Sequence, residues 1–259
     1  MSDTNKDKDN NKHFEIVIAR YNESLEWLQE YPFNDPTILQ FAYFTIYNKG
    51  DNDNFIRPIT KNSYRDQTQT RVIPLPNVGR CDHTYLYHIV TEYERNGLAN
   101  ITLFLPGSLS MDVKKKRAKE IIEEMRKLNF QRAIFIGHYS DTGIGKELKT
   151  FQLDSWQCSS PDNSEKNKES LLTKCKIRPY GNWFRYFFGD IRVHHLCYWG
   201  IFSIDKRDIL QNPANISRYR IFLHNLSLSS NPELGHYIER SWCALFYPMR
   251  FTKILRIKE

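Results

Sequence analysis

Short apolar runs alternate along the chain with longer segments of helical periodicity. Five of the runs have the length and composition of buried strands, and polar or turn-forming residues bound each of them. These predicted strands cover residues 15–19, 41–49, 100–106, 132–137 and 199–205.

Helical patterns lie between and after these runs. Segment 82–97 places Tyr85, Ile89 and Tyr93 four residues apart and ends at a glycine, which commonly follows the last helical turn. Strands that alternate with helices predict a single α/β domain with a mostly parallel sheet flanked by helices. Further helices are predicted at 23–31, 111–130, 217–229 and 234–247.

The polar segments predict how the 259 residues are divided. Residues 1–13 are charged and have no apolar stretch, so we expect a disordered tail there and no signal peptide. The domain is expected to span 14–250, with a flexible loop at 158–176, and a basic C-terminal tail is expected at 251–259.

Charge and cysteine usage narrow the class of protein. The net charge is +7, which suits a phosphorylated small molecule, a nucleic acid or an anionic membrane. The five cysteines are scattered and no pair is separated by two residues, which predicts reduced thiols in a cytoplasmic protein. No apolar run has the roughly 18 residues that would predict a transmembrane helix.

Two sequence motifs do not carry the chemistry that they suggest. The segment "SDTGIGKE" (140–147) has a serine in place of the first glycine of a phosphate-binding loop, and glutamate follows its lysine. His194 and His195 are adjacent in an extended segment, so they point to opposite faces and cannot easily share a metal ion.

A proline-bounded loop that leads into the helix at 82–97 is the best candidate for an anion site. It contains Asn77, Gly79 and Arg80, and Asp82 opens the helix. Backbone N–H groups at a helix N-terminus and a guanidinium beside them would together suit a diphosphate. The alternative is a capped helix whose arginine pairs with a nearby carboxylate.

Glu239 is a candidate acid or base. It lies in a predicted helix among Tyr237, Trp242 and Phe246, and apolar surroundings can raise the pKa of a carboxyl group. The alternative is an ion pair with Arg240 or another arginine.

Taken in order, several segments resemble a poorly characterised family of fungal, bacterial and viral proteins that is related to glycosyltransferases of the GT-A fold. They are "IVIARYNESLEWL", "YNKG", "LPNVGRCDHTYLYHI", "TLFLPG", "WGIFSIDKRDILQNP" and "ELGHYIERSWCALF", and they run from about residue 14 to 248.

The resemblance implies a Rossmann-like sheet that binds a nucleotide-sugar where its strands end. It also implies a base for an acceptor hydroxyl at Glu239, with Asp82 as the other candidate. The donor-binding residues that it implies are Arg20, Asn22, Glu23, Asn48, Lys49, Gly50, Asn77 and Arg80.

The chain departs from the GT-A pattern at the residues that would bind a metal ion. Many GT-A enzymes hold Mn²⁺ or Mg²⁺ with an Asp-x-Asp pair after the strand that resembles "TLFLPG", but "GSLSMD" follows it here. Asp112 remains as a weak candidate ligand, or cations from arginine and lysine replace the metal, or catalysis is lost.

The sequence therefore predicts a glycosyltransferase that moves a sugar from a nucleotide-sugar to an acceptor hydroxyl of a glycan, protein or lipid. Two alternatives stay open: a non-catalytic nucleotide-sugar-binding protein of the same fold, and a basic protein that binds nucleic acid through residues 114–119.

Overall fold

A five-stranded, mostly parallel sheet forms the centre of the molecule. The computed structural model describes residues 12–53, 55, 70–153 and 172–257. The strand order is β3-β2-β1-β4-β7, and only β7 runs antiparallel to its neighbour. The strands are β1 (Phe14–Arg20), β2 (Ala42–Asn48), β3 (Thr70–Pro74), β4 (Ile101–Pro106) and β7 (Phe202–Asp205).

β1 lies in the middle of the sheet and is buried on both faces. Val17 and Ala19 contact one hydrophobic cluster, while Ile16 and Ile18 contact the other. A central parallel strand covered on both sides explains why this segment is continuously apolar instead of alternating.

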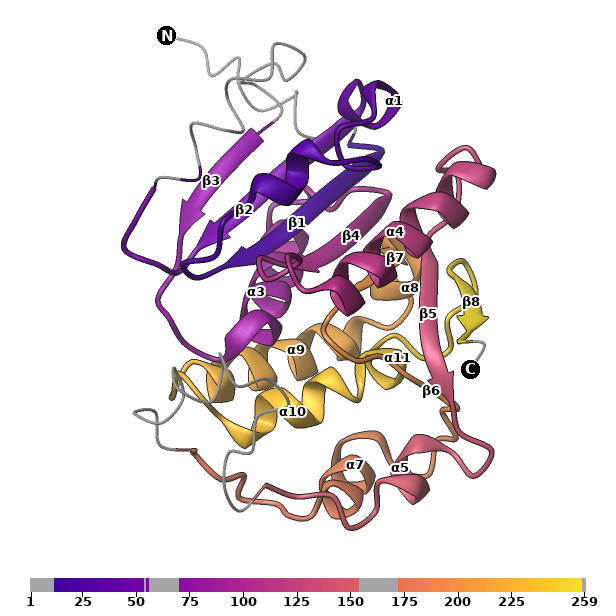
Figure 1. Ribbon diagram of the computed structural model, residues 1–259. Helices are drawn as coiled ribbons and strands as arrows, with labels where there is room; N and C mark the ends of the chain where they lie inside the picture. The colour runs from indigo at the N-terminus through magenta and orange to yellow at the C-terminus, as the bar shows by residue number, and fades with distance from the viewer. Residues whose placement is uncertain (1–11, 54, 56–69, 154–171, 258–259) are drawn as a thin grey trace, which may run out of the picture.

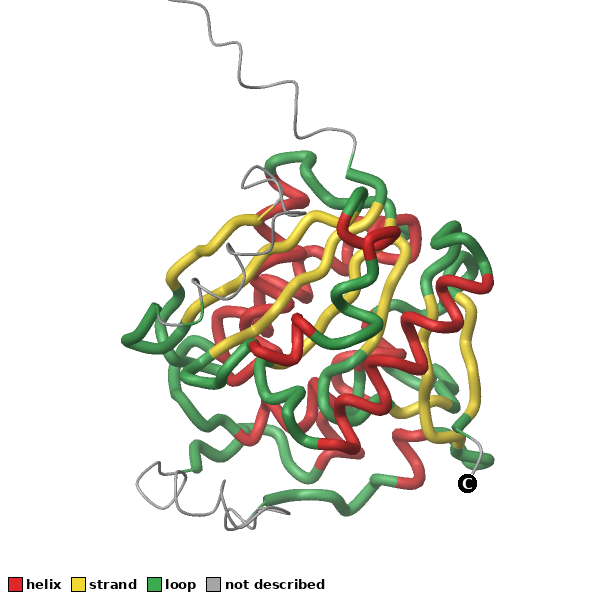
Figure 2. The backbone as a smooth tube through the Cα atoms, turned by 45° about the horizontal axis from the view of Figure 1, so that its top comes forward, coloured by secondary structure: helices red, strands yellow, loops and turns green. Residues whose placement is uncertain are grey.

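Helices cover both faces of the sheet (Figures 1 and 2). The cluster around Val17 includes α3 (Arg80–Glu94), α7 (Tyr180–Phe188), α9 (Pro213–Leu226), α10 (Glu233–Glu239) and α11 (Trp242–Leu245). The cluster around Ile16 includes η2 (Glu26–Gln29), α1 (Pro36–Leu39) and α4 (Asp112–Lys127). The predicted Rossmann-like α/β fold with a mostly parallel sheet is confirmed.

A second sheet continues beside β7. It has the order β6-β5-β8, with β5 (Ile134–Tyr139), β6 (His195–Leu196) and β8 (Lys253–Arg256). The hydroxyl of Ser203 in β7 accepts from the N–H of Ile134 at 2.6 Å and donates to its carbonyl at 2.9 Å, which joins the two sheets. Two short helices, α5 (Ile144–Glu147) and α8 (Lys206–Leu210), complete the fold.

Several predicted boundaries change in the structure. The helix predicted at 23–31 is only the 3-10 turn η2, and the one predicted at 234–247 is divided between α10 and α11. Part of the expected C-terminal tail forms β8, because its apolar residues pair with β5. Residues 1–11 of the expected N-terminal tail and 158–171 of the expected loop lie outside the described residues. Among the helices described, none has the length and apolar character needed to cross a bilayer.

Candidate functional site

The polar residues predicted to bind a donor lie at or just after the carboxyl ends of β1 and β2, or in the loop before α3 and at its first residue. Because β1, β2 and β3 are parallel, these ends lie along one edge of the sheet, where the arrowheads meet in Figure 1. This edge of an open α/β sheet is the usual place for a ligand.

Arg20 organises the loop that follows β2. Its side chain donates to Asn48 Oδ1 at 2.6 Å and to Asn52 Oδ1 at 2.7 Å, and only 2% of the residue is exposed. It also donates to the carbonyls of Glu23, Tyr21 and Asn52. In this structure Arg20 and Asn48 therefore hold the protein's own backbone.

Gly50 allows this loop to approach the segment after β1. A Cβ atom at Gly50 would lie 1.9 Å from the Tyr21 carbonyl oxygen and 2.1 Å from Asn22 Oδ1. Only glycine fits such a close approach of two backbones.

Lys49 connects the end of β2 to the turn before α3. Its ammonium donates to the carbonyls of Val78 and Arg80, and its backbone N–H donates to the carbonyl of Arg20 at 2.8 Å. Burial lowers the pKa of Lys49 to about 8. Lys49 thus fixes the backbone that carries Arg80.

The turn that presents Arg80 has a left-handed backbone. Gly79 has φ +58° and Arg80 has φ +56°, a region that arginine rarely adopts. A Cβ at Gly79 would lie 2.6 Å from His83 Cβ and 2.7 Å from Leu226 Cβ, so glycine is required there. The half-buried guanidinium of Arg80 reaches α10, where its Nη1 lies 3.5 Å from Nε2 of His236. Burial and the neighbouring arginines hold the pKa of His236 far below its ordinary value, so the imidazole is neutral and can accept this bond.

Asp82 follows Arg80 by two residues in the first turn of α3. It is 2% exposed, and its Oδ1 accepts from Nε1 of Trp242 at 3.1 Å. Burial, together with the charge of Glu239, raises the pKa of Asp82 to about 7. A carboxyl group of this kind exchanges its proton near neutral pH.

Replacing Asp82 with asparagine should change how stability depends on pH. Because the folded pKa is raised from 3.8 to about 7, the folded state holds a proton that the unfolded state releases, so stability falls as pH rises between these values. Asparagine can still accept from Trp242 and has no charge. The Asp82→Asn variant should therefore gain about 2 kcal/mol relative to wild type between pH 5 and pH 8 in urea unfolding. The exposed Asp112, changed to asparagine, is the control, and an identical pH dependence in wild type and Asp82→Asn would contradict the assignment.

Glu239 is at the C-terminal end of α10 and supports a second left-handed turn. Its Oε1 accepts from the N–H of Trp199 at 2.8 Å, and its Oε2 accepts from Arg240 at 3.2 Å. Trp199 and Gly200 have φ +67° and +63°, so the carboxylate holds a strained turn in place. The side chain of Glu239 is 21% exposed, which makes it more accessible than Asp82.

Lys114, in the first turn of α4, is a further cation beside these residues. Its ammonium donates to the Ser108 hydroxyl at 2.7 Å, two residues beyond the end of β4. The pKa of Lys114 is lowered overall, mainly by burial and also by the charge of Arg80. The charges of Cys81, Glu239 and Glu23 offset part of this decrease. The charges that act on Lys114 therefore come from the segment after β1, from α3 and from α10.

We call Glu23, Arg80, Asp82, Lys114, Glu239 and Arg240 the carboxyl-edge cluster. Of the residues predicted from sequence, Arg80, Asp82 and Glu239 lie where α3 packs against α10, and Glu23 lies in the segment after β1. Arg20, Asn48 and Lys49 build the loops around it, while Asn22 and Asn77 are exposed.

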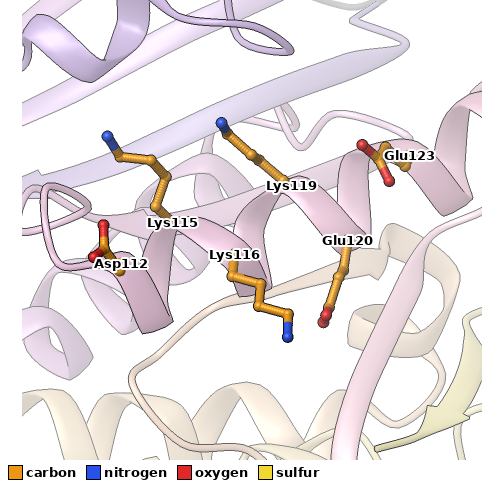
Figure 3. A pocket seen from close by; sticks show the side chains of 6 residues that line it. All are labelled: Asp112, Lys115, Lys116, Lys119, Glu120 and Glu123. Atoms are coloured by element: carbon orange, nitrogen blue, oxygen red, sulfur yellow. The ribbon is translucent and has the colours of Figure 1, made fainter.

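Asp112, the weak candidate for a metal ligand, is exposed and lies away from the carboxyl-edge cluster. A hollow of about 400 Å³ lies along the outer face of α4 and is formed by Asp112, Lys115, Lys116, Lys119, Glu120 and Glu123 (Figure 3). In Figure 3, Lys115 and Lys119 point to one side of the helix and Lys116 and Glu120 to the other, so these groups do not converge on one ligand.

The donor set at the carboxyl edge does not fit a divalent cation. Among the residues described, no three histidine, cysteine, aspartate or glutamate side chains are grouped closely enough to hold a metal ion. After β4, where the GT-A pattern has its Asp-x-Asp pair, the ammonium of Lys114 is bound to Ser108. A cation held by carboxylates is therefore not supported at this position.

Helical periodicity could have identified two of the missed residues. Lys114 precedes the buried Ala118, Ile121 and Met125 by four, seven and eleven residues, so it shares their inward face. His236, on α10, is likewise four residues before Arg240, which caps the C-terminus of that helix after Glu239.

Comparisons with known proteins add little to this geometry. No protein-family model matches the sequence, and no curated protein matches it. Among solved structures, the chain is similar to mannose-1-phosphate geranyltransferase from Thermus thermophilus, with 9% sequence identity and a TM-score of 0.35. That alignment covers 93% of this chain and 73% of the other.

Proposed function

We propose that the protein binds a nucleotide-sugar at the carboxyl-edge cluster and transfers the sugar to an acceptor hydroxyl. The observation that carries this proposal is the placement of Arg80 and Glu239. Arg80 begins α3 beside the carboxyl end of β2 and reaches His236 on α10, and the 21% exposed carboxylate of Glu239 ends the same helix α10. The guanidinium suits a diphosphate, and the carboxylate suits a proton acceptor.

In the proposed reaction, the acceptor oxygen forms a bond to the anomeric carbon of the donor sugar as the bond from that carbon to the diphosphate oxygen breaks. Glu239 takes the proton of the acceptor hydroxyl, and the nucleoside diphosphate leaves with the bonding electron pair. Arg80 binds the diphosphate, and the neutral His236 keeps the guanidinium in position. Asp82 is too buried to meet the acceptor, and its carboxyl oxygen accepts from the indole N–H of Trp242.

The basic run at 114–119 favours this proposal over nucleic-acid binding. Lys114 is directed to the carboxyl-edge cluster, and Lys115 pairs with Glu30 at 2.8 Å. The remaining lysines of the run, Lys116 and Lys119, line the same hollow as Asp112, Glu120 and Glu123. The helix therefore presents mixed charge where a nucleic-acid site would need a continuous basic surface.

Arg80→Met is the variant that tests donor binding. Calorimetric titration with uridine, guanosine and cytidine diphosphate sugars should show binding of at least one donor to the wild type. The variant should bind that donor about 10- to 100-fold more weakly, because a charged hydrogen bond to the diphosphate is lost. Arg220→Met is the control, since Arg220 is half-exposed and paired with Glu94 on the surface. Equal affinities of wild type and Arg80→Met would contradict the proposed site, and binding without turnover would favour a non-catalytic binding protein.

A further inference from the structure

We infer that the turn formed by residues 198–200 is the acceptor subsite, and that the acceptor is a neutral sugar whose ring packs on the indole of Trp199. We call these residues the aromatic turn; they lie in the connection between β6 and β7. The inference rests on the proposed function and deepens it, because it names the class of acceptor from the residues beside Glu239.

The aromatic turn contacts both helices that carry the carboxyl-edge cluster. On one side, the N–H of Trp199 donates to Oε1 of Glu239, at the end of α10, over 2.8 Å. On the other side, a Cβ at Gly200 would lie 3.1 Å from Cys81 Sγ and 3.1 Å from Cε2 of Tyr85, both in α3. Because Cys81 directly follows Arg80, an acceptor on this turn would lie beside both the proposed base and the proposed donor site.

The backbone of Trp199 is strained in a way that helix ends do not explain. Five non-glycine residues have a positive φ in the part of the chain that the structure describes. Asn96, Asn129 and Phe130 follow the ends of α3 and α4, where left-handed residues commonly end a helix. The other two are Arg80 and Trp199. Strain of this kind concentrates at binding and catalytic sites, so its presence on both sides of one contact indicates function.

The two aromatic side chains of the turn have packed bodies and open polar ends. Tyr198 and Trp199 are half-buried, and each packs against a different one of the two hydrophobic clusters. The Tyr198 hydroxyl and the Trp199 indole N–H have no hydrogen-bond partner among the described residues and are not buried, so both face solvent. The indole N–H groups of Trp27 and Trp242 donate to protein oxygens instead.

This combination of ring surface and open polar groups suits a sugar. A pyranose presents an apolar C–H face, which can pack on an aromatic ring, and a rim of hydroxyl groups that accept and donate hydrogen bonds. A serine or threonine of a protein acceptor offers no such face. The hydroxyl that attacks the donor would then lie on the side of the sugar nearest Glu239.

The arginines beside these rings favour a neutral sugar. Arg240 lies over the first ring of the turn and Arg117 over the second, with Cζ 5.4 and 5.9 Å from the ring centroids. Arg240 is paired with Glu239 at 3.2 Å, and Arg117 with Glu120 at 3.7 Å. Since each guanidinium already has a carboxylate partner, the two cations orient the rings without creating a net positive site for an anionic sugar.

Saturation-transfer NMR on the full chain tests this subsite with the methyl glycosides of glucose, galactose and mannose. Each is measured alone and with uridine, guanosine and cytidine diphosphate. The wild type should bind at least one glycoside, with saturation strongest on the protons of one ring face. Trp199→Leu keeps apolar bulk but no aromatic ring, so it should bind that glycoside at least about tenfold more weakly. Its affinity for the nucleotide-sugar donor should stay within about twofold of wild type.

Three comparisons serve as controls. Tyr186→Leu removes a 71% exposed tyrosine from α7 and should leave glycoside binding unchanged. Trp199→Phe keeps an aromatic ring and should retain most of the binding, and Tyr198→Leu repeats the loss of a ring if Trp199→Leu is unstable. Methyl glucuronide, which carries a negative charge, should bind no more tightly than the neutral glycosides.

The outcomes separate this inference from the proposed function. Donor binding by a wild type that binds none of the glycosides would overturn the inference and leave the proposed function intact, with a protein or lipid as acceptor. Glycoside binding that is unchanged in Trp199→Leu, or tighter binding of methyl glucuronide, would also overturn it. Glycoside binding that Trp199→Leu weakens, in a protein that binds no donor, would support the subsite and remove the proposed function.

Discussion

Replacing Glu239 with glutamine should slow sugar transfer by about 10²- to 10⁴-fold and leave donor affinity within about twofold of wild type. Glutamine retains the oxygen that accepts from the Trp199 N–H but cannot take a proton from the acceptor hydroxyl. Initial rates of transfer, measured with a donor that binds in the calorimetric screen, report the first effect. Titration of the same donor reports the second.

Two controls separate chemistry from structure in this experiment. Glu94→Gln changes a half-exposed carboxylate on α3 that pairs with Arg220, and it should leave the rate unchanged. The melting temperature of Glu239→Gln shows whether the turn at Trp199 and Gly200 is kept. A folded Glu239→Gln variant with a normal rate would exclude Glu239 as the base.

Replacing Glu15 with glutamine should lower the free energy of unfolding by about 3 kcal/mol, because it removes one partner from a buried charge network. Glu15 is fully buried in β1 and accepts from Thr45 Oγ1 at 2.5 Å and from Arg71 at 3.2 Å. Burial by itself would raise the pKa of Glu15, but His88, Lys12, Thr45 and Arg71 together bring that pKa below its ordinary value. Urea unfolding at pH 7 measures the effect.

Glu94→Gln is again the matched control, because its ion pair with Arg220 is half-exposed on both sides and should contribute less than about 1 kcal/mol. The pH dependence offers a second check. A lowered folded pKa means that the contribution of Glu15 is present above its unfolded pKa and is lost as pH falls through the folded value. The difference between wild type and Glu15→Gln should therefore shrink in acid, and a constant difference would contradict the network.

The sheet could be predicted largely from sequence because its central strands are buried on both faces. β1, β2 and β4 are apolar runs, and such runs have few other stable placements in a globular domain. β3 was not predicted, since it is a short edge strand with alternating half-buried and exposed residues. β8 is hard to predict for a related reason: it is a short strand with two apolar residues between two basic ones, none of them fully buried, and only pairing with β5 makes it a strand.

The candidate site could be predicted only in part. Arg80 and Asp82 were found because a loop that leads into a helix gives a local signal, and Glu239 was found because of its aromatic neighbours. Lys114 lies in a run where five of the six residues, 114–119, are basic, and only its spacing from the buried Ala118, Ile121 and Met125 distinguishes it from the others. The internal bonds of Arg20 and Lys49 could not be predicted either, since each depends on carbonyl groups from other segments.

The central claim, that the carboxyl-edge cluster transfers sugar from a nucleotide donor, is tested most directly by release of nucleoside diphosphate. The wild type is incubated with the donor that binds most tightly and a mixture of acceptor sugars, and products are detected by mass spectrometry. We predict free nucleoside diphosphate and an acceptor heavier by one sugar residue, both lost in Glu239→Gln. Products formed equally by wild type and Glu239→Gln, or no donor bound at all, would contradict the claim.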